Sequence, residues 1–189
     1  NFLIMPPAYY KYGDEEVINF YSRIINKHED IQIILYNFEK LCGYKFSPGC
    51  VRTLVEKFPS QIVGLKDSSY NLYETLKIEN FSMLPGSETK LLNGLKFGCS
   101  GIITATCNVT SRLARRVYDN FHNNEQQTEN EKLCKVREVF DKFNLISALH
   151  TFIGIEKSEY NNILPPISIL GKEKKEKLIL ELNSLNFKI

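Results

Sequence analysis

A lysine ends one of the most apolar runs of this sequence. The run Ile62–Lys66 reads Ile-Val-Gly-Leu-Lys, a pattern typical of a buried strand. Parallel strands present their carboxyl ends on the functional face of an α/β fold, so we expect Lys66 to point toward a site. A lysine held in an apolar pocket loses its proton more readily, and its neutral amine can attack a carbonyl carbon. The sequence therefore indicates Schiff-base chemistry at Lys66, with a lysine that snorkels to water as the alternative.

A tyrosine ends the apolar run that comes before. The run Ile31–Tyr36 predicts another buried strand, and Tyr36 lies at the end equivalent to Lys66. A phenol beside an amine can carry protons to and from a carbinolamine and a substrate hydroxyl. A strand-end tyrosine alone is more often an ordinary core residue, so its pairing with Lys66 makes Tyr36 a candidate acid and base.

Two loops on the same expected face carry further candidates. The segment Pro6–Tyr12 contains three tyrosines, which fit a pocket rim, a subunit interface or simply a rigid aromatic loop. The segment Leu84–Glu88 opens a helix, where backbone N–H groups and small hydroxyls can bind polar substrate atoms. Glu88 also suits the first turn of a helix without any further role, because acids are favoured there.

The elements that must position these residues alternate along the chain. Short apolar runs predict five strands: Phe2–Met5, Ile31–Tyr36, Ile62–Lys66, Phe81–Leu84 and Gly101–Ala105. Helix start signals lie between them at Asp14, Ser47, Ser87 and Thr110, and Gly98 is a plausible stop. After residue 109 the pattern is helical, over about 110–123, 128–153 and 172–185. Apolar strands separated by helices indicate parallel pairing in βα units.

Two fold classes fit this alternation. Strands recurring about every 20 to 30 residues are typical of a (β/α)8 barrel, of which the chain would supply the last five βα units. An open, flavodoxin-like doubly wound sheet is the alternative. We expect residues 1–109 to form the partial barrel, and residues 110–189 its final helix and a C-terminal helical extension of the same domain. Asn1–Met5 reads as a strand from the first residue, so we expect the chain to begin in mid-domain.

Composition excludes several classes of function. With 189 residues, 43% hydrophobic content and a net charge of +2, the chain fits a cytoplasmic globular protein without a nucleic-acid or membrane partner. The five cysteines form no CxxC pair, which argues against disulfides and zinc clusters. The three histidines are far apart in sequence, so we expect no metal and no cofactor.

Several ordered motifs resemble one known family. They are Tyr36-Asn37, Gly64-Leu-Lys66-Asp-Ser-Ser69, Pro85-Gly86-Ser-Glu88 and Gly98-Cys-Ser-Gly101-Ile-Ile-Thr-Ala-Thr-Cys-Asn108. Together they resemble the dihydrodipicolinate synthase and N-acetylneuraminate lyase family of class I, Schiff-base-forming aldolases. The resemblance covers essentially the whole chain, from the family's fourth barrel strand to its C-terminal helices. It implies a (β/α)8 barrel in which Lys66 forms an imine with pyruvate or another 2-oxo acid and Tyr36 shuttles protons.

The resemblance also implies substrate contacts. Gly86 and Glu88 fall where the family contacts the distal groups of its substrate, and Ile103 falls where a main-chain carbonyl faces the bound 2-oxo acid. Tyr10 matches a tyrosine that in many members reaches into the neighbouring subunit's site, so a homodimer or homotetramer is implied. The family's Gly-Thr-Thr-Gly-Glu loop, which binds the substrate carboxylate, would lie upstream of Asn1.

One departure from the family bears on the substrate. Leu41 stands where true dihydrodipicolinate synthases carry an arginine that binds the carboxylate of the aldehyde substrate. An apolar side chain cannot replace that clamp. We therefore expect cleavage or formation of a 2-keto-3-deoxy sugar acid or a sialate-type substrate. The acid pair expected of a sialate lyase is imperfect, because Thr89 follows Glu88. Condensation of pyruvate with aspartate semialdehyde, and a non-catalytic protein that binds a 2-oxo acid, remain the alternatives.

Overall fold

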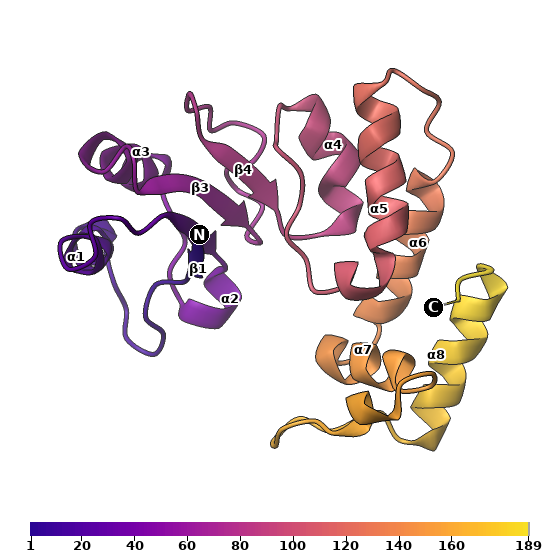
Figure 1. The fold of residues 1–189 in the computed structure, drawn as a ribbon. Helices are drawn as coiled ribbons and strands as arrows, with labels where there is room; N and C mark the ends of the chain where they lie inside the picture. Colours follow the sequence, from indigo (N-terminus) through magenta and orange to yellow (C-terminus); the bar gives the residue numbers. More distant parts are fainter. Residues whose placement is uncertain (189) are drawn as a thin grey trace. The chain divides into compact units, whose positions relative to one another are not determined.

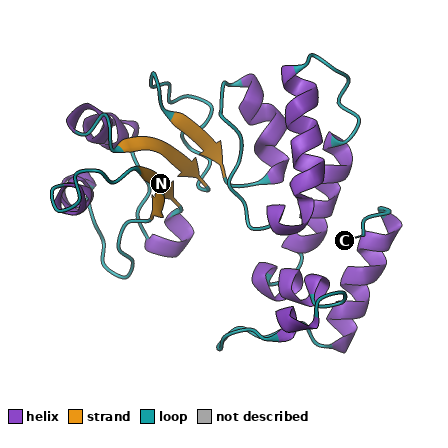
Figure 2. Ribbon diagram, viewed as in Figure 1, coloured by secondary structure: helices purple, strands orange, loops and turns teal. Residues whose placement is uncertain are grey.

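The computed structural model describes residues 1–188, which form two compact units. The first unit comprises Asn1–Gly86 and Asn93–Ile103, and the second comprises Ser87–Leu92 and the chain from Thr104 onward. Figure 1 labels the helices and strands along the chain. The four strands of the described residues all lie in the first unit, and the second is helical (Figure 2).

The sheet of the first unit keeps the order of the chain. Its strands are β1 (Phe2–Ile4), β2 (Ile33–Asn37), β3 (Ile62–Asp67) and β4 (Ser82–Pro85). They pair in the order β1-β2-β3-β4, and every pair is parallel. A barrel adds its strands in chain order, whereas a doubly wound sheet reverses that order at a switch point. The topology therefore favours the barrel over the open sheet.

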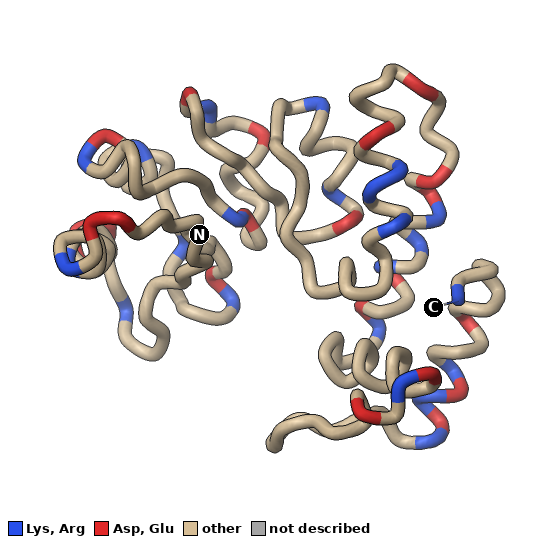
Figure 3. Tube along the Cα trace, viewed as in Figure 1, with Lys and Arg blue, Asp and Glu red and all other residues tan. Residues whose placement is uncertain are grey.

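One face of this sheet is covered by helices. These are α1 (Asp14–Ile25) and α3 (Pro48–Lys57), which pack against each other and, with the sheet, enclose the core. Ser47 caps α3 by accepting a hydrogen bond from the Cys50 N–H, with Pro48 at the first helical position as predicted. Acidic residues gather at the start of α1 (Figure 3), where they complement the positive end of the helix dipole.

Alternation along the strands separates two sets of side chains. Leu35 and Leu65, which are register partners, belong to the core beneath α1 and α3. Successive residues of a strand point to opposite faces, so Tyr36 and Lys66 share the face away from those helices. This face is less buried than the core side, and its edge residue Leu3 is 42% exposed.

The predicted fifth strand, 101–105, is not a strand. Ser100 N–H donates to the Met83 carbonyl at 2.9 Å and Ile103 N–H to the Pro85 carbonyl at 3.2 Å, so the segment does run beside β4. The two donors are three positions apart in the sequence, but their acceptors are only two positions apart. Gly101 at φ +144° breaks the extended backbone between them, which prevents a regular ladder.

The second unit is a packed group of helices. The main ones are α5 (Cys107–His122), α6 (Asn130–Asp141), α7 (Leu145–Ile153) and α8 (Lys172–Ser184). The predicted helix 128–153 is in fact α6 and α7, because the Asn144 side chain caps a new helix by accepting from the Ser147 N–H. Helix α5 begins three residues before the predicted start at Thr110. A stacked pair, Phe152 and Phe187, lies in the core at a ring distance of 5.8 Å.

Within the described chain, four short helical elements lie between the longer ones. They are the helix α2 (Glu39–Cys42), the 3-10 turns η1 (Glu88–Lys90) and η2 (Ser158–Asn161), and α4 (Leu91–Lys96). Ser87 caps η1 as predicted, and Gly98 follows α4 at φ +80°, where glycine is favoured. Across residues 1–188, none of the helices is long and apolar enough to cross a membrane.

Candidate active site

Lys66 and Tyr36 lie side by side on the sheet. They are register partners at the ends of β3 and β2, and each is half-buried. The Lys66 Nζ atom lies over the Tyr36 ring, 4.0 Å from its centroid. The structure thus brings together the amine and the aromatic ring that sequence reasoning had paired. Their chemical roles stay predictions.

The Tyr36 ring also contacts a second aromatic ring. Phe38 stacks on it with a centroid distance of 5.9 Å and an interplanar angle of 29°. The Lys66 side chain therefore lies beside aromatic rings at the carboxyl end of the sheet.

Sequence reasoning missed a polar network directly behind this pair. Asn37 and Asp67 are register partners and are both fully buried. The Asn37 Nδ2 group donates to Asp67 Oδ1 at 2.8 Å. Asp67 also accepts backbone N–H bonds from Tyr70 at 2.9 Å, Leu72 at 2.8 Å and Tyr73 at 3.0 Å. A carboxylate with four donors around it is a satisfied buried acceptor.

The network extends to the loop that follows β2. Asn37 Nδ2 also donates to Asn71 Oδ1 at 2.8 Å, and Asn37 Oδ1 accepts from the Phe46 N–H at 3.1 Å. Asn71 Nδ2 donates to the Phe46 carbonyl at 3.0 Å. The signal that could have revealed it is the placement of a polar residue right after both Tyr36 and Lys66, at positions that alternation turns toward the core.

Gly86 has a structural reason to be glycine. It follows β4, and its N–H donates to the Asp67 carbonyl at 3.0 Å. A Cβ at this position would lie 2.9 Å from the Ser68 Cβ and 3.1 Å from the Ser68 Cα. The strand ends β3 and β4 therefore approach so closely that no side chain fits between them. Substrate contact by Gly86 stays a prediction.

The other predicted contact residues of the first unit lie at different depths. Ile103 is half-buried, and its N–H is bound to the Pro85 carbonyl. Leu41 lies on α2 and is 58% exposed. Tyr10 is 68% exposed and packs edge-on against Tyr9. The side chains of Leu41 and Tyr10 thus lie on the surface of this chain.

Glu88 belongs to a buried ion pair in the second unit. Its side chain is fully buried, and its Oε2 atom lies 3.0 Å from Arg137 Nη1. Thr104 Oγ1 donates to Oε2 at 3.0 Å, and Thr110 Oγ1 donates to Oε1 at 2.9 Å. Both carboxylate oxygens therefore have protein partners. The implied substrate contact of Glu88 stays a prediction, while its internal bonds are what the structure shows.

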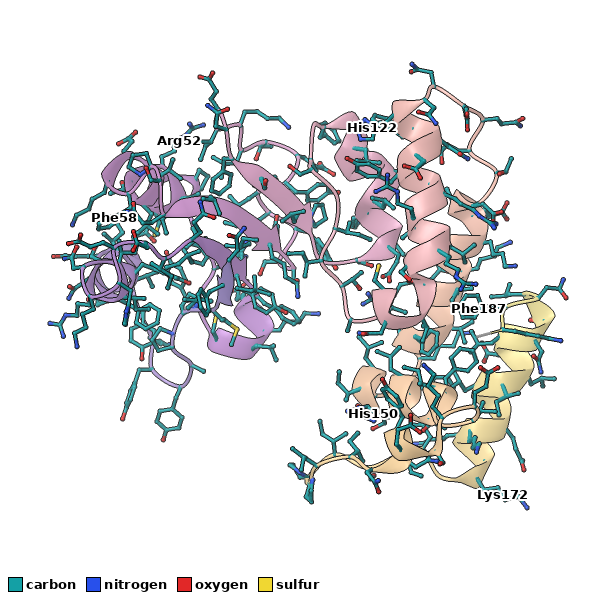
Figure 4. The ribbon with its side chains drawn as sticks, viewed as in Figure 1. Arg52, Phe58, His122, His150, Lys172 and Phe187 are labelled. Atoms are coloured by element: carbon teal, nitrogen blue, oxygen red, sulfur yellow. The ribbon has the colours of Figure 1, made fainter. Side chains whose placement is uncertain are left out.

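The same cluster affects a nearby thiol. Burial, followed by the negative charge of Glu88, raises the pKa of Cys107 to about 11. In the part of the chain that is described, no group of three or more His, Cys, Asp or Glu residues could hold a metal ion. His122 and His150, labelled in Figure 4, lie on α5 and α7.

Comparison with known proteins decides the family. Residues 1–184 match the dihydrodipicolinate synthetase family. The chain belongs to this family. Members similar to it include a 2-dehydro-3-deoxy-D-gluconate/2-dehydro-3-deoxy-phosphogluconate aldolase of Picrophilus torridus, 25% identical over 178 residues, which are 90% of this chain and 66% of that protein. A 4-hydroxy-tetrahydrodipicolinate synthase of Wigglesworthia glossinidia brevipalpis is 29% identical to this chain, and the match covers 90% of this chain and 60% of that protein.

Solved structures of the family share the fold. A prophage protein of Escherichia coli K12 from the dihydrodipicolinic acid synthase family, solved in complex with pyruvate, aligns with a TM-score of 0.81 and 21% identity. The alignment covers 98% of this chain and 66% of that protein. The structure is thus part of a (β/α)8 barrel, as predicted, and the chain spans no more than two thirds of the length of these relatives.

Proposed function

We propose that this chain provides the Schiff-base chemistry of a lyase that cleaves or forms a carbon–carbon bond between pyruvate and an aldehyde. The observation that carries the proposal is the Lys66 amine held 4.0 Å from the Tyr36 ring centroid at the carboxyl end of a parallel sheet. Membership in the dihydrodipicolinate synthetase family supports it.

The reaction needs one amine and one proton carrier. The neutral Lys66 amine adds to the ketone carbon of the 2-oxo acid, and the carbinolamine loses water to form an iminium. Removal of the proton from the hydroxyl on the β carbon then breaks the bond between the α and β carbons, which frees the aldehyde and leaves the electron pair of that bond in the iminium system as an enamine. Protonation of the enamine and hydrolysis return pyruvate and the amine. The Tyr36 phenol is the group next to Lys66 that can move the protons of these steps.

A 2-keto-3-deoxy sugar acid is our preferred substrate class. Leu41 is apolar and exposed, so it offers no clamp for a second carboxylate. The names of the Picrophilus torridus relative and of a probable 2-dehydro-3-deoxy-D-pentonate aldolase of Escherichia coli, 27% identical over 91% of this chain, point the same way. Condensation of pyruvate with aspartate semialdehyde is the second candidate, favoured by the name of the Wigglesworthia relative.

We also propose a cytoplasmic homodimer or homotetramer. The exposed Tyr10 and Tyr9 rings, at 68% and 92%, suit burial in a subunit interface, where tyrosine is enriched. Sedimentation analysis of the wild type and of Tyr10→Ser tests this: a smaller species in the variant supports the interface, and identical species argue against it.

Reductive trapping tests the chemistry. Incubation with pyruvate and borohydride is expected to add one reduced pyruvate to the Lys66 peptide, as read by mass spectrometry. Lys66→Arg should abolish the adduct. Lys57→Arg is the matched control, because Lys57 also lies over an aromatic ring, 5.5 Å from the Phe58 centroid, but outside the site. An adduct that persists in Lys66→Arg refutes the assignment of the nucleophile.

A second variant separates binding from turnover. Tyr36→Phe keeps the ring but loses the hydroxyl, so the trapped adduct should still form, at a lower rate, while aldehyde release slows by about 10²–10⁴-fold. Unchanged turnover would exclude the phenol as the proton carrier. Trapping in a wild-type chain that turns over none of the candidate substrates would favour the non-catalytic binding protein.

A further inference from the structure

The core-facing side of the sheet contains two buried polar residues that packing alone does not require. Asn37 and Asp67 follow Leu35 and Leu65 on this side, and all four side chains are fully buried. Burying a carboxylate is costly unless donors surround it, and a well-packed apolar pair of similar size is often at least as stable. Their presence therefore calls for a role other than filling the core.

Each member of this pair directly follows a candidate reactive residue. Tyr36 and Lys66 are register partners, and Asn37 and Asp67 are the next register pair along the same two strands. Alternation places the polar pair on one face and the reactive pair on the other. A shift or rotation of the backbone at position 37 or 67 must therefore move the side chain that precedes it.

Hydrogen bonds of Asn37 and Asp67 connect the ends of β2 and β3 to each other and to the loops that follow them. Asn37 Nδ2 joins the two strand ends through Asp67 Oδ1 at 2.8 Å. Asp67 holds the turn after β3 through the N–H groups of Leu72 and Tyr73. Asn37 Oδ1 holds the loop after β2 through the Phe46 N–H at 3.1 Å. The ends of both strands and the loops that leave them are thereby tied into one network.

We propose that Asn37 and Asp67 are positioning residues that set the placement of the Lys66 amine over the Tyr36 ring. They act through the backbone of β2 and β3 and touch no substrate. The geometric part of this proposal stands on the contacts above, while its consequence for catalysis rests on the proposed function. Asn71, which bonds to Asn37 from an exposed position, is an outer member of the same network.

The placement of Lys66 can be measured without any reaction. In the full 189-residue chain labelled with ¹³C at the lysine Cε atoms, the Lys66 signal should be shifted upfield by the ring current of Tyr36. Lys66→Arg assigns the signal, and Tyr36→Leu should remove the upfield shift. Asn37→Asp, which sets a second carboxylate against Asp67, should move the signal toward that of the other lysines. The exchange Asn37→Asp with Asp67→Asn should restore part of the upfield shift, because one N–H donor again faces one carboxylate, while the Tyr70 N–H and Asn71 Oδ1 lose their present partners.

Two further variants separate positioning from stability. Asn71→Ala loses one partner from an exposed position, so it should fold even where Asn37→Asp does not, and it should move the Lys66 signal part of the way. Leu54→Ala opens the same core away from the network. It should lower the melting temperature while the Lys66 signal of the folded protein stays in place. An unmoved Lys66 signal in Asn71→Ala and Asn37→Asp, with only the melting temperature lowered, overturns the proposal.

The catalytic consequence has its own readout. Trapping of pyruvate by borohydride should slow by about 10- to 100-fold in Asn37→Asp, as expected for a small misplacement of a reacting group, and recover in part in the exchange variant. A wild-type chain that forms no adduct refutes the proposed function but leaves the NMR comparison intact. A displaced Lys66 signal with an unchanged trapping rate overturns the catalytic part of the positioning proposal.

Discussion

Removing the Arg137 guanidinium should destabilise the protein far more than removing a surface arginine. The Arg137 side chain is 11% exposed and its partner Glu88 is fully buried. Arg137→Met keeps much of the apolar stem but leaves the Glu88 carboxylate without its counter-charge. Breaking one side of a buried ion pair typically costs about 3–5 kcal/mol. The i,i+4 contact of Arg137 with Asp141, whose side chain is 48% exposed, adds only about 0.3–0.5 kcal/mol.

A double-mutant cycle isolates this contribution. Glu88→Gln combined with Arg137→Met removes both charges, so the double variant should lose clearly less free energy of unfolding than the two single losses added together. Arg115→Met is the matched control, because the Arg115–Asp119 pair is 70% and 44% exposed and is worth about 0–1 kcal/mol. Urea unfolding followed by circular dichroism gives each value from the midpoint and slope.

The refuting result is equally specific. If Arg137→Met lost no more than Arg115→Met, the Glu88 carboxylate would not depend on its buried partner. If the losses of the single variants were additive, the two residues would not be energetically coupled. Either result would argue against a structural role for the Glu88 carboxylate and would favour the substrate contact that the family resemblance implies.

Three further predictions concern backbone approach, thiol ionisation and the sheet edge. Gly86→Ala should cost about 1–3 kcal/mol in urea unfolding, because its Cβ would lie 2.9 Å from the Ser68 Cβ, whereas Gly49→Ala, whose nearest contact is 3.7 Å, should be neutral or stabilising. Burial raises the pKa of the Cys99 thiol to about 11 from 9.0. The protonated thiol therefore contributes its full stabilisation of the folded state below pH 9. This stabilisation is lost as pH rises toward 11, by up to about 1.4 kcal/mol per pH unit. Cys99→Ala should accordingly flatten the fall in melting temperature over that range, and an unchanged slope would contradict the assignment. Leu3→Lys should reduce light scattering by the protein, because a charge on the edge strand β1 opposes edge-to-edge pairing of two sheets. Scattering equal to that of the wild type would argue that chains do not associate through this edge.

The strands were predictable because their signal is local. Apolar runs bounded by turn residues located β1 to β4 to within two residues at each end. The predicted strand at 101–105 was wrong because a strand also needs a partner in register, and Gly101 at φ +144° breaks that register. The division of 128–153 into α6 and α7 was missed because amphipathic spacing continues across Asn144, whose capping role depends on the backbone conformation there.

The candidate site was predictable only in part, for a related reason. The closeness of Tyr36 and Lys66 follows from strand ends and alternation, both of which can be read from sequence. The Asp67 network was missed because three of its four donors are backbone N–H groups, and their directions are set by the turn after β3. Glu88 was predicted at a helix start, but its partner Arg137 is 49 residues away and no local pattern connects them.

The register pairing of β2 with β3 has a consequence for how the chain acquires reactivity. The Lys66 amine and the Tyr36 ring are thirty positions apart, with α3 and its loops between them. An unfolded chain pays loop-closure entropy to bring such distant groups together, so their mutual encounter there is rare and brief. The reactivity proposed for Lys66 should therefore be absent from the unfolded chain and arise only when the crossover between the two strands has closed, so the rate of borohydride labelling at Lys66 during refolding should report on that folding step.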